Sequence, residues 1–155
     1  MLKIRVINGP NLNLLGTREP QVYGNTTLES IENILRREAG EYGVKIEFFQ
    51  SNHEGAITDC IHEAANTGCD GLILNPGAYT HYSYAIRDAI AATGIPTVEV
   101  HLSNIHSRED FREKSVIAPV CLGQVSGLGA VSYSAALFAL VKKLKEARAG
   151  GSREG

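Results

Sequence analysis

The chain has few cysteines and no long apolar run. Its 155 residues include three cysteines, Cys60, Cys69 and Cys121. None forms a CxxC pair and an odd number cannot all pair within one chain, so we expect buried free thiols in a reducing compartment. No apolar run approaches the roughly 20 residues that span a bilayer, and Lys3 and Arg5 interrupt the first apolar stretch, which leaves no signal-peptide core. These absences predict a soluble, cytoplasmic protein without a membrane partner.

An excess of charge and the common nucleotide-binding motifs are also missing. The net charge of −2 gives no electrostatic reason to expect nucleic acid as a partner. No GxxxxGK[ST] loop, no GxGxxG opening the first helix and no GxSxG elbow occurs, so nucleotide cradling and serine acyl-hydrolase chemistry are unsupported. His53, His62 and His106 lack metal-ligand spacing to one another, so no metal site is expected.

What the sequence does contain is a regular alternation of β-rich runs and helical periodicity. Strands are predicted over residues 2–7, 44–50, 71–74, 97–101 and about 119–125. Strands that alternate with helices indicate a parallel sheet covered on both faces. We therefore predict one α/β domain over residues 1–148, a flavodoxin-like, doubly wound five-stranded parallel sheet in the order 2-1-3-4-5.

The helices are predicted between these strands. A capping box of Thr26 and Glu29 opens the first, which ends at Gly43. A short polar helix is expected over residues 108–114. The last helix is expected to turn Leu137, Phe138, Val141 and Leu144 inward, and residues 149–155 are predicted to form a disordered tail.

Polar residues gather where the predicted strands end, the edge at which parallel sheets bind ligands. One cluster follows the first strand, in a loop over residues 9–25 with Asn11, Asn13, Arg18, Glu19 and Tyr23. A second, residues 75–81, contains Asn75 and His81, and a third covers residues 99–104. Because side chains alternate along a strand, Glu99, His101 and Ser103 should point the same way. A carboxylate beside an imidazole can hold the ring as a charged, oriented acid.

Ordinary structural roles remain open for several of these residues. His101 could be a satisfied histidine near a sheet end, although a buried Glu99 is costly unless something requires it. Arg108 and Arg112 share one face of the short helix and could form a solvated charged face. Asn75 could serve turn chemistry alone. Taken together, a tyrosine, a His–Glu pair, arginines and amides suit proton abstraction beside a carbonyl and proton donation to a leaving hydroxyl.

Several longer motifs extend this set of residues. They are NGPNLNLLG at residues 8–16 followed by REP and YG, QSNHEG at residues 50–55, NPGAYTH at residues 75–81, AIRDA at residues 85–89, and EVHLSNIH at residues 99–106 running on to Phe111-Arg112. The sequence here resembles the type II dehydroquinases, the 3-dehydroquinate dehydratases of the shikimate pathway. The resemblance extends from Leu2 to about Leu144.

The resemblance implies catalytic roles for five residues. Tyr23 would be the base that removes the proton beside the substrate ketone, with Arg18 lowering the pKa of its phenol. Asn11, through a water, would stabilise the enolate. His101, charged and oriented by Glu99, would protonate the departing hydroxyl.

It also implies how the substrate, 3-dehydroquinate, is held. Asn75, Ser103 and the backbone amides of Leu102 and Ser103 would bind its carboxylate, while His81 and Arg112 would bind ring hydroxyls. The family uses no cofactor and assembles trimers into dodecamers, so a homo-oligomer is expected, with Asp88 reaching a neighbour's site. The sequence departs from the family pattern at Tyr82, where Thr is more usual, and at Ser132, where Gly is.

Two other interpretations of the sequence differ from this one in fold or in activity. A flavodoxin-like binding module for a nucleotide or flavin would bind a cofactor in the cleft and form no enone from dehydroquinate. The other dehydroquinase class, a Schiff-base (β/α)₈ barrel, needs about 200 residues or more and is excluded by length.

Overall fold

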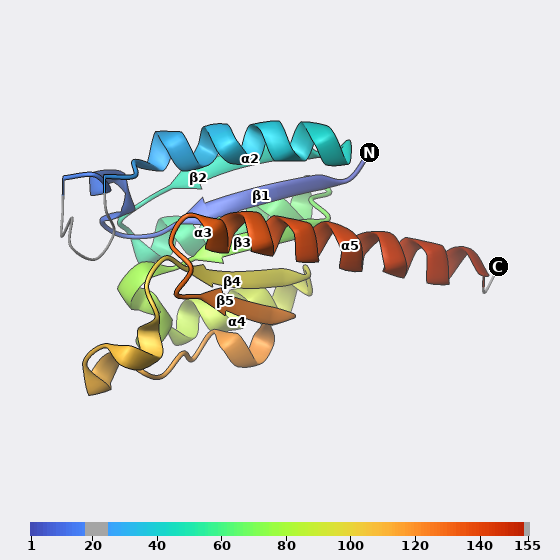
Figure 1. The fold of residues 1–155 in the computed structure, drawn as a ribbon. Coiled ribbons are helices and arrows are strands. Elements are labelled where there is room, and N and C mark those ends of the chain that lie inside the picture. The colour runs from blue at the N-terminus through green and yellow to red at the C-terminus, as the bar shows by residue number, and fades with distance from the viewer. Residues whose placement is uncertain (18–24, 154–155) are drawn as a thin grey trace.

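A computed structural model describes residues 1–17 and 25–153, with side chains to residue 151. Its sheet consists of β1 (Lys3–Asn8), β2 (Lys45–Gln50), β3 (Gly71–Asn75), β4 (Thr97–His101) and β5 (Gly123–Ser126). All the neighbouring strands are parallel, in the order β2-β1-β3-β4-β5 (Figure 1). The predicted fold class and strand order are confirmed.

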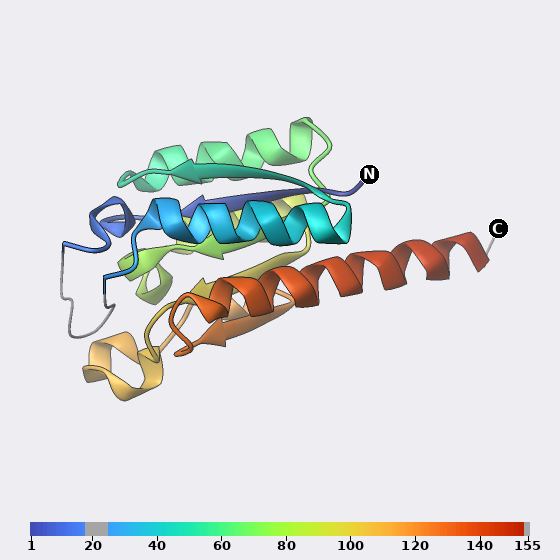
Figure 2. The same cartoon turned by 45° about the horizontal axis from the view of Figure 1, so that its top comes forward.

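The helices are α2 (Leu28–Tyr42), α3 (Glu54–Asn66), α4 (Tyr84–Thr93) and α5 (Val131–Arg153). The end of α5 projects beyond the edge of the sheet at which the strands begin, as Figures 1 and 2 both show. This helix continues through most of the stretch from Ala149, where the composition predicts a disordered tail.

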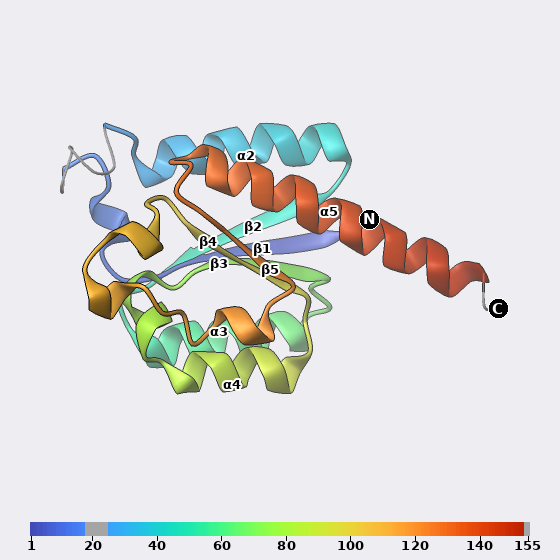
Figure 3. The same cartoon turned by 60° about the horizontal axis from the view of Figure 1, so that its bottom comes forward.

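Two hydrophobic cores lie on opposite faces of the sheet. Helices α2 and α5 cover one face and α3 and α4 the other (Figure 3). On the inner strand β1, Ile4 and Val6 pack into the first core and Ile7 into the second, all fully buried. Strand β3 is buried along its whole length, as expected for a strand covered on both faces. This packing holds the carboxyl ends of the strands in fixed positions.

Some predicted element boundaries were wrong, for identifiable reasons. The capping box is formed by Thr27 and Ser30 rather than Thr26 and Glu29, because the Ser30 hydroxyl accepts from the Thr27 amide while its own amide donates to Thr27. The fifth strand is four residues, Gly123–Ser126, and residues 118–120 form a 3-10 turn. Pro119, which lacks an N–H for the sheet ladder, lies within that turn.

Two helical predictions also needed correction. The expected helix over residues 108–114 is only a 3-10 turn, η4 (Asp110–Arg112), and its Phe111 is exposed. No apolar stripe is present there to hold a longer helix against the sheet. In α5, Leu137, Val141 and Leu144 are buried as predicted, but Phe138 is more than half exposed, because it lies about 100° around the helix from Leu137.

Candidate active site

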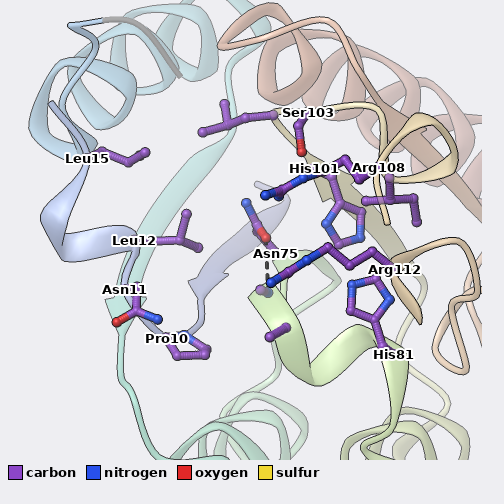
Figure 4. A pocket seen from close by; sticks show the side chains of 14 residues that line it. Pro10, Asn11, Leu12, Leu15, Asn75, His81, His101, Ser103, Arg108 and Arg112 are labelled. Atoms are coloured by element: carbon purple, nitrogen blue, oxygen red, sulfur yellow. Dashed lines mark hydrogen bonds between the residues drawn. The ribbon is translucent and has the colours of Figure 1, made fainter. Parts of the chain in front are cut away.

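A pocket opens at the carboxyl ends of β1, β3 and β4. Its volume is about 170 Å³, below the roughly 300–1,000 Å³ of drug-sized ligand sites, so it suits a small molecule. It brings together residues from all three predicted clusters, namely Asn11, Asn75, His81, His101, Leu102 and Ser103, and also Arg112. In Figure 4, His101, His81 and Arg112 lie on one side of the pocket and Asn11 on the other, with Asn75 between them.

The end of β4 supplies an imidazole with a buried carboxylate partner. Glu99 and His101 lie on one side of the strand, as their spacing predicts, and His101 Nε2 is 2.5 Å from Glu99 Oε2. Glu99 is fully buried, and His101 is 6% exposed where it meets the pocket. Nε2 donates to the carboxylate, which leaves Nδ1 as the ring nitrogen available to a bound molecule.

Glu99 is built to carry a negative charge in spite of its burial. Burial pushes its pKa upward, but hydrogen bonds from His101, Thr80 and Ser115, together with the positive charge of protonated His101, outweigh it. The pKa of Glu99 therefore lies below the usual value for a glutamic acid.

His81, from the 3-10 turn η2 (Gly77–His81), has the opposite character. Its Nδ1 lies 2.8 Å from the backbone carbonyl oxygen of Lys114, which can only accept, so Nδ1 carries the hydrogen. Burial lowers the pKa of His81 despite that hydrogen bond, and the charges of His101 and Arg112 lower it further. A neutral His81 presents Nε2 as an acceptor, which suits a hydroxyl group on a ligand.

Two arginines line the same pocket, although the sequence left a solvated role open for both. Arg112 Nε lies 2.8 Å from Glu109 Oε2, an ion pair whose alignment does not make a hydrogen bond. Arg108 lies four residues earlier in the sequence and is half-buried. Both contribute fixed positive charge to the pocket and favour an anionic ligand.

Asn75, at the end of β3, is oriented by its neighbours. Its Oδ1 accepts from the Gly77 amide at 3.1 Å, and its Nδ2 donates to the Tyr133 hydroxyl at 2.9 Å. Tyr133, fully buried in α5, in turn donates to Asn8 Oδ1 at 2.6 Å. This chain fixes which end of the Asn75 amide faces which neighbour, so Asn75 has the expected turn contact and also lines the pocket.

The loop after β1 is locked against the loop after β3. The Gly9 amide donates to the Asn75 carbonyl at 2.7 Å, and a Cβ at Gly9 would lie 2.6 Å from the Pro76 carbonyl oxygen. Asn11 has a left-handed backbone with φ of 68°, and its amide donates to Asn52 Oδ1 at 3.0 Å. Glycine at position 9 is therefore a steric requirement, and Asn52 holds Asn11 in a backbone conformation that asparagine tolerates better than most residues.

Two of the predicted site residues that the structure describes do not line the pocket. Glu99 lies behind His101, and Asp88 is exposed on α4, outside the pocket lining. Arg18 and Tyr23 lie outside the described residues.

Sequence reasoning also missed three residues that contact Glu99, namely Thr80, Ser115 and Gln124. Gln124 could have been found from the alignment of β5 with β4, in which it stands opposite Glu99. The misplaced boundary of the fifth strand concealed that pairing.

A second hollow, of about 420 Å³, lies between the ends of α2 and α5. It is lined by Tyr42, Phe138, Val141, Lys142, Lys145, Glu146 and Ala149. Although larger, it lies away from the strand ends and holds no paired acid and base, so the pocket at His101 is the better candidate for chemistry.

The described part of the chain, residues 1–17 and 25–153, has no group of three His, Cys, Asp or Glu side chains that could hold a metal ion. In the same residues, no helix is long and apolar enough to cross a membrane.

Known proteins share both this sequence and this fold. The profile of the family "Dehydroquinase class II" matches residues 2–141. A 3-dehydroquinate dehydratase of Caldicellulosiruptor bescii is 61% identical over 140 residues, which cover 90% of this chain and 97% of that protein. One from Bacillus cytotoxicus is 60% identical over 147 residues, 95% of this chain and all of that protein. The crystal structure of type II dehydroquinase from Butyrivibrio crossotus superposes with a TM-score of 0.88 at 52% identity, covering 90% of this chain and 97% of that one.

The fold and the pocket define an α/β enzyme with an acid–base site for a small anionic molecule at the strand ends. The matches narrow this class, because they extend over nearly the whole chain and over nearly the whole of each relative. The chain belongs to the class II dehydroquinase family. The resemblance seen in the sequence is thereby confirmed. The chain does not belong to a family of nucleotide- or flavin-binding modules.

Proposed function

We propose that this protein dehydrates 3-dehydroquinate to 3-dehydroshikimate, in the shikimate pathway. The observation that carries the proposal is the Glu99–His101 pair, which presents a protonatable imidazole to a small pocket lined by arginines. Relatives at about 60% identity bear the name 3-dehydroquinate dehydratase. Elimination of water beside a ketone requires a base, a place for the enolate charge and an acid for the leaving group.

The first step is removal of the proton beside the ketone. We assign the base to Tyr23 and its activation to Arg18, on the strength of the family motif, since both lie outside the described residues. The electrons of the C–H bond pass to the carbonyl oxygen as an enolate. Asn11 lines the pocket and is assigned, through a water, to stabilise that negative charge.

The second step is loss of the hydroxyl group. The enolate electrons return to form a carbon–carbon double bond as the adjacent carbon–oxygen bond breaks. His101, protonated and oriented by Glu99, gives its Nδ1 proton to the departing oxygen, which leaves as water. The product is a conjugated enone, and the imidazole is left neutral.

Substrate binding is assigned to the rest of the pocket lining. Asn75, Ser103 and the amides of Leu102 and Ser103 are proposed to hold the carboxylate. His81 is suited to accept a ring hydroxyl hydrogen through its free Nε2, and Arg112 to hold a second hydroxyl.

Assembly is also part of the proposal. Because Asp88 is exposed on α4 and outside the lining of its own pocket, we assign it to a neighbour's site in a trimer, with trimers forming a dodecamer. Tyr82 and Tyr84 are exposed beside it, and exposed aromatic residues are typical of subunit interfaces. If so, Asp88→Ala should weaken substrate binding, and activity should be lost when the enzyme is diluted to monomers.

The test of the activity is direct. Purified protein mixed with 3-dehydroquinate should generate the ultraviolet absorbance of a conjugated enone, and His101→Ala should generate it far more slowly. Absence of the enone with the intact protein would refute the proposal. A flavin or nucleotide that copurifies in the cleft would favour the binding-module alternative.

A second test separates this mechanism from imine chemistry. Among the described residues, those that line the pocket include no lysine, so the reaction should not pass through a Schiff base. Borohydride added with substrate should leave the enzyme active and its mass unchanged. A substrate-sized adduct would contradict the mechanism.

A further inference from the structure

Glu99 accepts hydrogen bonds from three side chains in addition to His101. Its Oε2 accepts from Thr80 Oγ1 at 2.7 Å and from Gln124 Nε2 at 3.0 Å, in addition to His101. The Ser115 hydroxyl lies 2.7 Å from Oε1 and 3.0 Å from Oε2. A fully buried carboxylate is thus surrounded by donors on both oxygens.

These three further residues come from three separate segments. Thr80 lies in η2 after β3 and is itself fully buried, Ser115 follows η4, and Gln124 lies on β5. Gln124 is the register partner of Glu99 across the parallel ladder of β4 and β5. The backbone on both sides is also fixed, since the Val116 amide donates to the Thr80 carbonyl at 2.8 Å. Their convergence on one carboxylate is therefore set by the fold.

We propose that Thr80, Ser115 and Gln124 are positioning residues of the acid, which keep Glu99 ionised so that the proton remains on the His101 ring. The inference rests on the proposed function and extends it by three residues. A buried carboxylate without donors tends to take up a proton, and the proton closest to it is the one on His101 Nε2. If that proton moved to Glu99, the ring would lose the positive charge that makes it an effective acid.

Other ionisable and charged groups face the pair from the surrounding elements. They are His81 on η2, Arg108 and Arg112 in the segment after β4, and Cys121 before β5. Burial and the Glu99 charge raise the pKa of the Cys121 thiol to about 12, so it adds no charge near neutral pH. The arginines stay charged throughout, and the lowered pKa of His81 keeps it neutral there. Near neutral pH, none of these four groups should therefore gain or lose a proton.

The donors matter most after the ring has given up its proton. While His101 is charged, it compensates Glu99, but once His101 is neutral the carboxylate depends on its remaining donors. Removing one donor therefore destabilises the deprotonated pair more than the protonated pair. The pair should hold its proton more tightly, and the alkaline limb of the pH–rate profile should move to higher pH by about 0.5 to 1 unit. A more tightly held proton is also given up more slowly, so kcat should fall about 3- to 10-fold.

Thr80→Val and Gln124→Leu test this inference without changing the acid itself. Valine keeps the shape of threonine and removes its donor, and Thr80→Ser is the matched control because it retains the hydroxyl. Gln124 is only half-buried on an edge strand, so its variant remains informative if Thr80→Val folds poorly. Ser115 is less suitable, because its Oγ also accepts from the amides of Ile117 and Ala118.

Two measurements are needed, the pH dependence of kcat and an NMR titration of the His101 ring in substrate-free enzyme. The titration requires no turnover, so it tests the inference even if wild-type protein forms no enone, a result that would sink only the proposed function. We expect both midpoints to rise in Thr80→Val and in Gln124→Leu and to stay at the wild-type value in Thr80→Ser. Unchanged midpoints in both donor-free variants, or equal shifts in Thr80→Val and Thr80→Ser, would overturn the inference.

Discussion

Two groups of charged side chains pack against the sheet, one on β1 and β2 and one at the end of β4. They differ in whether every charged group in them has a partner. In the first group, the Arg5 cluster, the Arg5 guanidinium contacts Glu47 at 3.0 Å and Glu63 at 3.5 Å, and Lys3 contacts Glu47 at 3.2 Å. Arg5 also donates to the Cys60 carbonyl at 3.1 Å. These charges satisfy one another.

In the second group, Glu99 is satisfied by its donors, but among the described residues His101 has a hydrogen-bond partner on one nitrogen only. The other nitrogen faces the pocket, together with Arg112 and a neutral His81. The comparison shows how to separate structural charge from functional charge. A closed cluster contributes to folding stability, whereas a cluster with one open position has a place for a substrate atom.

The largest expected effect is a loss of turnover when the second group loses His101. His101→Ala removes the acid and should lower kcat by about 10²- to 10⁴-fold. Its melting temperature should also fall, because the buried Glu99 loses its charged partner, but the loss of turnover should be the larger effect. Steady-state kinetics and thermal melts measure the two quantities. Near-normal turnover would mean that His101 is a structural histidine.

Arg5→Met should give the reverse pattern. Replacement of Arg5 removes its hydrogen bonds to the Cys60 carbonyl and to Glu47, so the free energy of unfolding should fall by about 1–3 kcal/mol. The kcat of the folded enzyme should be unchanged, because Arg5 does not line the pocket. Urea unfolding and kinetics on the same preparation test this pair of outcomes, with Arg5→Lys as the charge-retaining control. A loss of kcat without a loss of stability would erase the distinction between the two groups.

The smallest effect is expected from Glu47→Gln. Burial raises the pKa of Glu47, but hydrogen bonds from Arg5 and Lys3 outweigh it and hold the pKa below the ordinary value of 4.5. The stability from this lowered pKa is present above pH 4.5 and is lost as the pH falls through the folded-state value. The variant should therefore be less stable than wild type at pH 7 by under about 1 kcal/mol. Urea unfolding at several pH values should show this difference shrinking toward pH 3, and a difference that grows there would contradict the assignment.

Much of the fold could be predicted because local signals agreed with one another. The buried runs at β1 and β3 and the ending of α2 at Gly43 follow from apolar periodicity and from a left-handed glycine with φ of 68°. The segment between β4 and β5 could not be predicted in the same way. It consists of short 3-10 turns without an apolar stripe. Its position depends on contacts with residues distant in the sequence, such as the hydrogen bond from His81 Nδ1 to the Lys114 carbonyl.

The candidate site divides along the same line. Glu99 and His101 could be paired from the sequence, because alternation along one strand is a local rule. Thr80, Ser115 and Gln124 could not be connected to Glu99, because each reaches it from a different segment. The role of Tyr133 behind Asn75 was hidden for the same reason, since the two residues lie 58 positions apart in the sequence.

The central claim is that the Glu99 carboxylate keeps the His101 ring protonated, so that it can act as the acid. The pH–rate profile of Glu99→Gln tests this claim most directly. Glutamine keeps the shape of the side chain and removes its negative charge. The ring should then hold its proton less tightly, and the alkaline limb of kcat should move to lower pH by about 1 to 3 units. An alkaline limb at the wild-type pH, in a variant that folds normally, would show that the Glu99 carboxylate is structural and would contradict this account.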